Sequence, residues 1–186
     1  CRTGEDGPKG VSTVLVPDGT EGLSFGKNED KMGWRAQPTA IVNFEDCRVP
    51  VENRIGPEGE GFKYAMKGLD GGRLNIAACA LGGAQDALDR ALGYVKERKQ
   101  FGKRLADFQN TQFALADMET ELAACRALLH TAARKLDARA SDATKYCAMA
   151  KRFVTDAAFK VADQALQLHG GYGYLADYEV ERIVRD

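Results

Sequence analysis

The sequence predicts an α+β chain in which an incomplete β domain precedes an up-and-down antiparallel four-helix bundle whose last helix is cut short. Two observations support this fold class. The first third has short β-prone runs separated by proline and glycine, and the rest has long segments whose apolar residues recur every three or four positions. We therefore expect a β domain over residues 1–55 and an incomplete helical bundle domain over residues 56–186.

Three short runs in the first third have high β propensity. Residues 11–17 end at a proline, residues 23–25 follow two glycines, and residues 39–50 form a longer candidate strand that also ends at a proline. Three or four strands are too few for a well-closed sheet. We therefore expect further sequence of this domain to lie upstream of residue 1.

The helical part begins after the glycine-rich loop at residues 56–61. A first helix is expected from about residue 62 to residue 98, and a second from about residue 111 to residue 139. A third is expected from residue 142, with Asp142 as its N-cap, to residue 168, and a fourth from Tyr178. The second helix carries a bundle seam at steps of three and four, formed by Leu115, Met118, Leu122, Cys125, Leu129, Ala132 and Leu136.

The composition excludes several classes of protein. A formal net charge of -1 gives no basic excess for nucleic acid or an anionic membrane, so an anion site would have to be local. The five cysteines are odd in number and widely spaced, with no C-x-x-C pair and only two histidines, which argues against a disulfide framework or a metal site. No apolar run reaches the roughly 18 residues of a spanning helix, and no secretory signal is present.

The strongest local feature is a basic run at residues 96–104 that contains five cations. Arg98 could bind a phosphate through two parallel hydrogen bonds, and Phe101 and Phe108 could pack on a flat ring system. The same run also fits an ordinary solvated helix C-terminus.

Two other segments could contact a ligand. Asp70 and Arg73 lie three residues apart among glycines, which suits either a ligand site or an intrahelical ion pair. Residues 167–174 join a helix end to a glycine-rich backbone that could offer N–H groups to a ligand. The alternative is a glycine C-cap, with His169 as a satisfied or exposed histidine.

In this order on a helical bundle, these segments resemble those of the acyl-CoA dehydrogenases, flavoenzymes that oxidise an acyl thioester to its α,β-unsaturated product. Within the family, residues 71–77 and 164–175 are most similar to the isobutyryl-CoA dehydrogenase branch, with short-chain enzymes close behind. The resemblance extends over essentially the whole chain and rests on residues 44–50, 59–62, 98–102, 108–109, 115–118, 167–174, 177–178 and 185–186.

The resemblance implies that FAD binds at a subunit interface and that residues 1–55 are the end of the family's β middle domain. Arg98 would bind the pyrophosphate of the neighbouring subunit's FAD, and Asp70 and Arg73 would bind the adenosine–pantetheine portion of the acyl-CoA substrate. The other implied FAD contacts are Gln100 and Phe101 beside Arg98, Phe108 and Gln109 at the adenosine end, and Gln167, Leu168, His169, Gly170 and Gly171.

The implied reaction needs a carboxylate to remove the α-proton while the β-hydrogen leaves as hydride to the flavin. No catalytic base is assigned here, because the family's glutamate is expected beyond Asp186 and the position used by a minority branch is Gly72. Glu179 and Glu181 are interpreted as a solvated helix face, so residues 1–186 alone are expected to be inactive.

The resemblance implies two partners: an electron-transfer flavoprotein, and further copies of the chain in a dimer or tetramer. It also implies a role in fatty acid or branched-chain amino acid catabolism. The compartment would be the cytoplasm of a bacterium or the mitochondrial matrix of a eukaryote. Two alternatives remain open, namely an acyl-CoA oxidase of the same fold and a non-catalytic helical interaction module.

Overall fold

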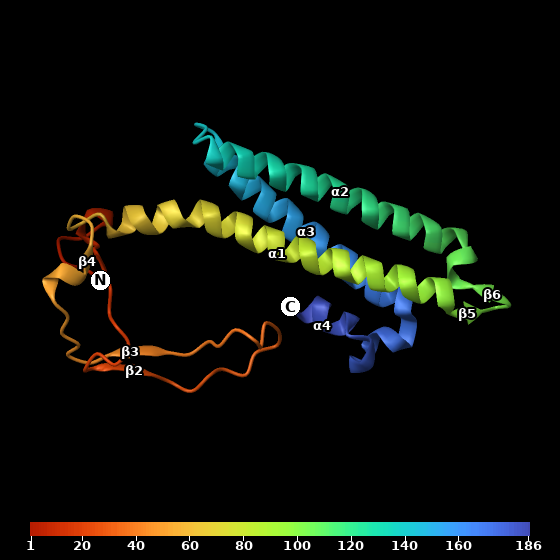
Figure 1. The fold of residues 1–186 in the computed structure, drawn as a ribbon, viewed down its shortest axis with the longest axis horizontal. Coiled ribbons are helices and arrows are strands. Elements are labelled where there is room, and N and C mark those ends of the chain that lie inside the picture. Colours follow the sequence, from red (N-terminus) through yellow and green to blue (C-terminus); the bar gives the residue numbers. More distant parts are fainter. The chain divides into compact units, whose positions relative to one another are not determined.

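The computed structural model describes all of residues 1–186, which divide into two compact units, Cys1–Leu69 and Asp70–Asp186. The long helix α1 (Gly61–Glu97) runs through this division (Figure 1). β4 ends at Ile55 and α1 starts six residues later, whereas the two compact units divide after Leu69, so the domain boundary after residue 55 stays a prediction.

The first unit contains two antiparallel strand pairs. β1 (Thr13–Val14) pairs with β4 (Arg54–Ile55), and β2 (Leu23–Phe25) pairs with β3 (Val42–Phe44). The strands expected at 11–17 and 39–50 are much shorter than predicted, because each has one hydrogen-bonded neighbour. β1 ends three residues before Pro17, which has no N–H to donate, and β3 ends two residues before Asp46, whose φ of 48° breaks the extended backbone.

Two 3-10 turns, η1 (Pro8–Gly10) and η2 (Val51–Asn53), complete the first unit. Its buried polar anchor is Ser12, whose hydroxyl lies 2.6 Å from the Thr3 hydroxyl and accepts the Gly59 N–H at 2.9 Å. These bonds fix the N-terminal segment to the loop that leads into α1.

The second unit is a bundle of helices with alternating directions, as the sequence predicted. α2 (Gln109–Asp137) and α3 (Ala143–His169) lie beside α1, and the short α4 (Val180–Arg185) follows the turns η4 (Gly170–Tyr174) and η5 (Ala176–Tyr178) (Figure 1). α2 and α3 each begin and end within two residues of the positions that the sequence predicted.

The core of the bundle is built largely from small side chains. Alanines of α1 and α3 pack with larger residues of all four helices, among which Leu122 and Val154 are fully buried. Small residues at facing positions let helix axes approach closely, which explains why a sequence so rich in alanine forms a continuous core.

Two local details of this unit add to what the sequence predicted. Asp142 occupies the predicted N-cap position of α3, but its carboxylate accepts two hydrogen bonds from Lys135, at 2.8 and 2.9 Å, and does not cap the first N–H groups of the helix. The basic run does not simply end α1, because β5 (Lys99–Gln100) and β6 (Lys103–Arg104) form a hairpin. Its two-residue turn has positive φ at Phe101 and Gly102, the conformation that matches the strand twist.

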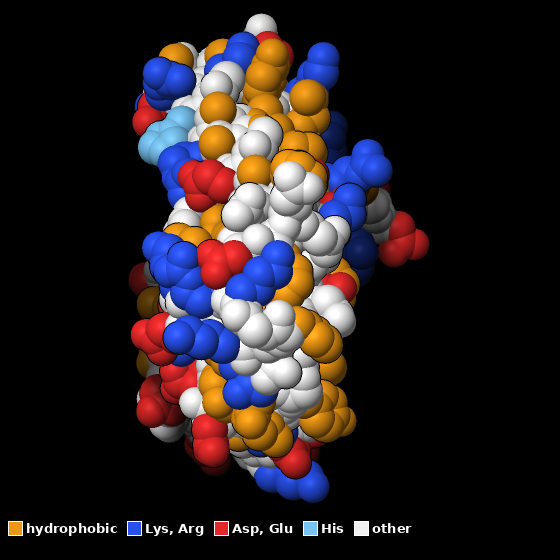
Figure 2. Space-filling model, turned by 90° about the vertical axis from the view of Figure 1, so that its right-hand side faces the viewer, with side chains coloured by type: hydrophobic (Ala, Val, Ile, Leu, Met, Phe, Trp, Pro, Cys, Tyr) orange, Lys and Arg blue, Asp and Glu red, His pale blue; other side chains and the backbone are white.

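The surface carries charges of both signs. On the face drawn in Figure 2, Lys and Arg side chains are interspersed with Asp, Glu and apolar side chains. None of the helices is both long and apolar enough to cross a membrane.

Candidate functional site

The candidate site is a cavity of about 380 Å³ in the second unit. The end of α1, the β5–β6 hairpin, the end of α3 and the turn η4 meet there. No carboxylate lines the cavity, and its one permanent cation is Arg98. The lining residues are Tyr94, Arg98, Gln100, Leu105, Gln167, Leu168, His169, Gly170, Gly171, Tyr172 and Leu175.

Arg98 is fixed by its backbone. Its N–H donates to the Tyr94 carbonyl at 2.9 Å, and its own carbonyl accepts the Leu105 N–H at 2.9 Å, which anchors the hairpin to the end of α1. The guanidinium carbon lies 5.1 Å from the centroid of the Tyr172 ring, and the structure contains no ion pair of Arg98 with a carboxylate. An unpaired guanidinium beside aromatic rings suits an anionic ligand that also has a flat ring.

Four aromatic residues form what we call the aromatic cluster: Tyr94, His169, Tyr172 and Tyr178. His169 is 4% exposed and stacks on Tyr94, with 4.5 Å between the ring centroids. Its Nδ1 lies 2.7 Å from the Ala165 carbonyl oxygen, which can only accept, so Nδ1 carries the hydrogen. His169 is thus a satisfied histidine, and burial raises the pKa of the Tyr94 hydroxyl.

The glycine segment lies at the carboxyl end of α3. Gly170 has φ of 60°, and its N–H already donates to the Gln167 carbonyl, so this N–H is not free for a ligand. A helix C-terminus carries partial negative charge and therefore does not attract an anion, so the attraction has to come from the Arg98 guanidinium. Gly173 packs closely under the turn, because a Cβ there would lie 2.5 Å from the Leu166 carbonyl oxygen.

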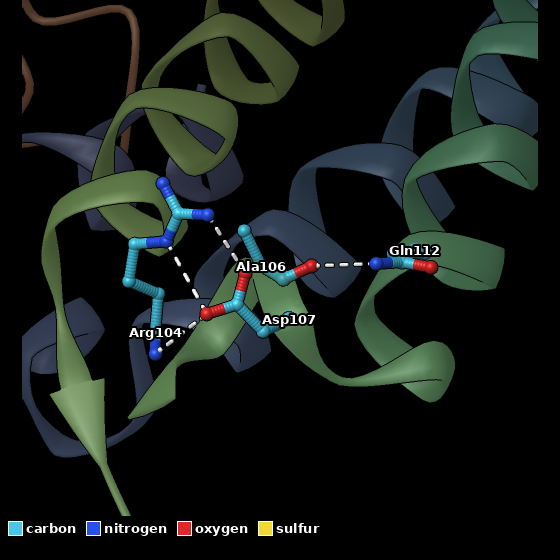
Figure 3. A network of polar contacts seen from close by, with 4 residues as sticks. All are labelled: Arg104, Ala106, Asp107 and Gln112. Atoms are coloured by element: carbon cyan, nitrogen blue, oxygen red, sulfur yellow. Dashed lines mark hydrogen bonds and ion pairs between the residues drawn. The ribbon is translucent and has the colours of Figure 1, made fainter. Parts of the chain in front are cut away.

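Arg104, the neighbouring cation in the sequence run, is committed to an internal contact (Figure 3). Its Nε and Nη2 bind the two Asp107 carboxylate oxygens at 3.2 and 2.9 Å, and its backbone N–H also donates to Asp107 at 3.1 Å. This contact lowers the pKa of the Asp107 carboxyl. The Gln112 side chain donates to the Ala106 carbonyl at 2.9 Å, which ties the 3-10 turn η3 (Leu105–Asp107), directly after the hairpin, to α2.

Phe101 and Phe108 lie outside the cavity lining, Phe101 in the turn of the β5–β6 hairpin and Phe108 at the N-cap position of α2. Phe101 is 89% exposed at the hairpin tip and meets the Phe108 ring edge-on, with 6.4 Å between centroids. The Lys103 ammonium lies 4.1 Å from the Phe108 centroid. Gln109 is the first residue of α2 and does not line the cavity.

Asp70 and Arg73 form the ion pair that the sequence allowed, with Arg73 Nη1 2.6 Å from Asp70 Oδ1. The second carboxylate oxygen of Asp70 accepts the Thr144 hydroxyl at 2.6 Å, which links α1 to α3. Arg73 lies 25 residues before Arg98, about 37 Å along the helix at about 1.5 Å per residue. The two candidate binding regions are therefore far apart on one chain.

The glutamates near the C-terminus are ion-paired. Glu179 lies 2.9 Å from Arg90, and Glu181 accepts from Arg185 at 2.6 Å. The Arg185 contact lowers the pKa of Glu181, whereas a proton-abstracting base in a dry pocket needs a raised pKa.

The cavity also includes four residues that sequence reasoning missed. Tyr94 could have been found, because it lies one helical turn before Arg98 on the same face. Tyr172 lies in the glycine-rich segment that the sequence analysis singled out for its backbone and not for this ring, whereas no local pattern marks Leu105 in η3 or Leu175 after η4.

Comparisons with known proteins identify the family of the chain. Residues 59–186 match the family model described as acyl-CoA dehydrogenase, C-terminal domain. The whole chain is 57% identical to mitochondrial isobutyryl-CoA dehydrogenase of Bos taurus and 58% identical to that of Dictyostelium discoideum, and it covers 45% of each. The chain thus spans about half the length of these relatives.

Solved structures give the same result. The structure of butyryl-CoA dehydrogenase from Megasphaera elsdenii is 45% identical with a TM-score of 0.94, over 99% of this chain and 48% of that one. A structure of PigA with FAD and proline is 30% identical with a TM-score of 0.91, over 97% and 47% of the two chains. The chain therefore belongs to the acyl-CoA dehydrogenase family.

Proposed function

We propose that this chain is part of an FAD-dependent dehydrogenase that forms an α,β double bond in a short or branched acyl-CoA similar to isobutyryl-CoA. The similarity to isobutyryl-CoA dehydrogenases supports the substrate class. The observation that carries the proposal is the unpaired Arg98 guanidinium in a cavity without carboxylates.

The residues of the cavity fit FAD. Arg98 would bind the diphosphate, Gln100 and Gln167 offer amide groups for hydrogen bonds, and His169 and Tyr94 wall the cavity with ring surface. Phe101 in the hairpin turn and Phe108 at the start of α2 would pack at the adenosine end, next to Gln109, while Leu168, Gly170 and Gly171 lie along the backbone wall. The chemistry that FAD supplies when bound is acceptance of a hydride.

Asp70 and Arg73 are proposed to bind the CoA portion of the substrate. Because both Asp70 oxygens are already engaged, Asp70 would hold Arg73 in place and Arg73 would make the contact. The chain holds no suitable base among its matched positions, and Glu179 and Glu181 are ion-paired. Residues 1–186 expressed alone should therefore show no acyl-CoA oxidation with an artificial electron acceptor, and turnover above background would contradict this.

We further propose that the protein acts as a dimer or tetramer. Two adjoining cavities of about 500 and 380 Å³ lie between α2 and α3. Glu121 of α2 lines both and Asp117 lines one, while Lys160 of α3 lines both, and Arg152 and Asp156 of α3 line one and lie 3.8 Å apart. A second copy related by a two-fold axis could set Asp117 and Glu121 of one chain against Lys160 of the other, with the apolar side chains between them buried.

The proposed electron acceptor is an electron-transfer flavoprotein, in the mitochondrial matrix of a eukaryote or the cytoplasm of a bacterium. A solved structure of the prolyl acyl carrier protein oxidase AnaB, 30% identical to this chain, favours an oxidase as the second candidate. Fast reoxidation of the substrate-reduced flavin in air would indicate an oxidase, and slow reoxidation a dehydrogenase.

The cofactor site is tested by comparing Arg98→Gln with Arg104→Gln in the full-length protein. Loss of a hydrogen-bonded charge at the diphosphate should weaken FAD binding about 10-fold to 150-fold. Arg104→Gln is the matched control, since Arg104 is paired with Asp107 and does not line the cavity. Equal FAD affinity of Arg98→Gln and wild type, measured by flavin absorbance after reconstitution, would refute the site.

The substrate class is tested separately by steady-state turnover with isobutyryl-, butyryl-, 2-methylbutyryl- and isovaleryl-CoA. Preference for isobutyryl-CoA supports the branched-chain assignment, and preference for butyryl-CoA replaces it with a short-chain one. A full-length protein that binds flavin but reduces it with none of the four would favour a non-catalytic module.

A further inference from the structure

The aromatic cluster forms a continuous series of ring contacts that ends at Arg98. Tyr178 meets both Tyr94 and His169 edge-on, at centroid distances of 5.9 and 6.1 Å. Tyr172 lies 5.2 Å from Tyr178, and the Arg98 guanidinium lies over the Tyr172 ring. Because His169 is buried and bonded to the α3 backbone, this series of rings links the Arg98 guanidinium to the bundle core.

Other arginines of this unit are held in a different way. Arg73, Arg90 and Arg104 each pair with at least one aspartate at 2.6 to 3.0 Å. A carboxylate fixes a guanidinium but also neutralises it, so such an arginine attracts phosphate weakly. A ring face attracts the cation through its quadrupole and leaves the full charge and the N–H groups available.

We propose that Tyr172 is a positioning residue for Arg98. The Tyr172 ring holds the Arg98 guanidinium at the cavity wall and leaves its charge available for a diphosphate ligand. This inference rests on the proposed function, because it assumes that the cavity binds FAD. Tyr178 contacts the Tyr172 ring and is itself held by Tyr94 and His169, so the Tyr172 ring does not have to be ordered when the ligand binds.

Two substitutions at Tyr172 separate the ring from the hydroxyl in the full-length protein. Tyr172→Leu removes the ring and should weaken FAD binding between about 2-fold and about 30-fold, the range of a cation–π contact from exposed to desolvated. Tyr172→Phe keeps the ring and should bind FAD within about 2-fold of wild type. Binding of riboflavin, which lacks phosphate, should be the same for all three proteins.

A series of fluorinated phenylalanines at position 172 tests the same contact without altering the packing. Fluorine withdraws charge from the ring face, so FAD affinity should fall stepwise as fluorines are added, while the thermal unfolding midpoint stays constant. This series keeps the test decisive if Tyr172→Leu does not fold.

A double-mutant cycle distinguishes positioning from direct contact between the ring and the ligand. In an Arg98→Gln background, Tyr172→Leu should change FAD affinity by less than about 2-fold, because its effect acts through Arg98. A Tyr172→Leu effect that persists in that background, a flat fluorination series, or an equal loss of riboflavin binding would overturn the inference. If Arg98→Gln itself leaves FAD affinity unchanged, the cofactor site fails, which is a different result.

Discussion

Gly173 provides a sharp test of how the turn after α3 is packed. An alanine Cβ at this position would lie 2.5 Å from the Leu166 carbonyl oxygen and 3.1 Å from the His169 Cβ. The first contact is 0.9 Å shorter than the 3.4 Å at which ordinary contact begins (3.4 minus 2.5). Because Leu166 contributes backbone of α3, the turn η4 has to move away from the helix.

The expected cost follows from a matched pair of variants. Gly173→Ala and Gly171→Ala lie in the same turn, both have negative φ, and a Cβ at Gly171 meets nothing within 4 Å. Both lose the same unfolded-state freedom, which stabilises by about 0.4–1 kcal/mol. Their difference in free energy of unfolding therefore isolates the steric overlap, and overpacking of this kind costs about 1–3 kcal/mol.

The assay is urea unfolding of both variants and wild type, followed by circular dichroism. Gly173→Ala should unfold at the lowest urea concentration and Gly171→Ala at or above the wild-type midpoint. Equal midpoints for the two variants would show that η4 does not pack on α3 as described. Displacement of η4 also moves Tyr172, so Gly173→Ala should weaken FAD binding as well.

Three further outcomes are expected. Leu122→Ala should lower the free energy of unfolding by about 2–5 kcal/mol in urea titrations, because Leu122 is 0% exposed in the bundle core and the substitution leaves a cavity; a loss below about 1 kcal/mol would contradict that packing. The Lys135 contact lowers the pKa of Asp142 below its ordinary 3.8, so the contact stabilises above pH 3.8 and the stabilisation is lost as pH falls through the lowered value. Asp142→Asn should thus be less stable than wild type at pH 6, with the difference shrinking in acid unfolding curves; a constant difference would argue against the ion pair. Cys79 is exposed and should react with a thiol reagent in the native protein, whereas Cys125 is buried and burial raises the pKa of its thiol, so mass spectrometry should find it labelled only after unfolding.

The long helices could be predicted because their signals are periodic and redundant. The seam that contains Met118, Leu122 and Cys125 repeats over seven positions, so one ambiguous residue does not move the helix. The N-cap position of Asp142 was predicted correctly, but not its side-chain contact, because a single polar residue has several possible partners and Lys135 on the preceding helix binds its carboxylate.

The hairpin in the basic run was missed for a related reason. A two-residue hairpin turn is usually marked by Asn-Gly or Asp-Gly, and here Phe101 adopts positive φ in front of Gly102. The sequence therefore showed the charges of this run but not which of them is neutralised. Only the fold separates Arg104, which is paired with Asp107, from Arg98, which is not.

The length of α1 between Arg73 and Arg98 has a consequence for an oligomer. If one chain's Arg98 serves the cofactor of its neighbour, as proposed, each active site is assembled in trans from the Arg73 of one chain and the Arg98 of another. A chain damaged at Arg73 and a chain damaged at Arg98 would then complement each other, because their hybrid contains one site with both arginines intact. The genetic dominance of such mutations and the activity of the hybrid oligomers would thus depend on the separation of Arg73 and Arg98 along α1.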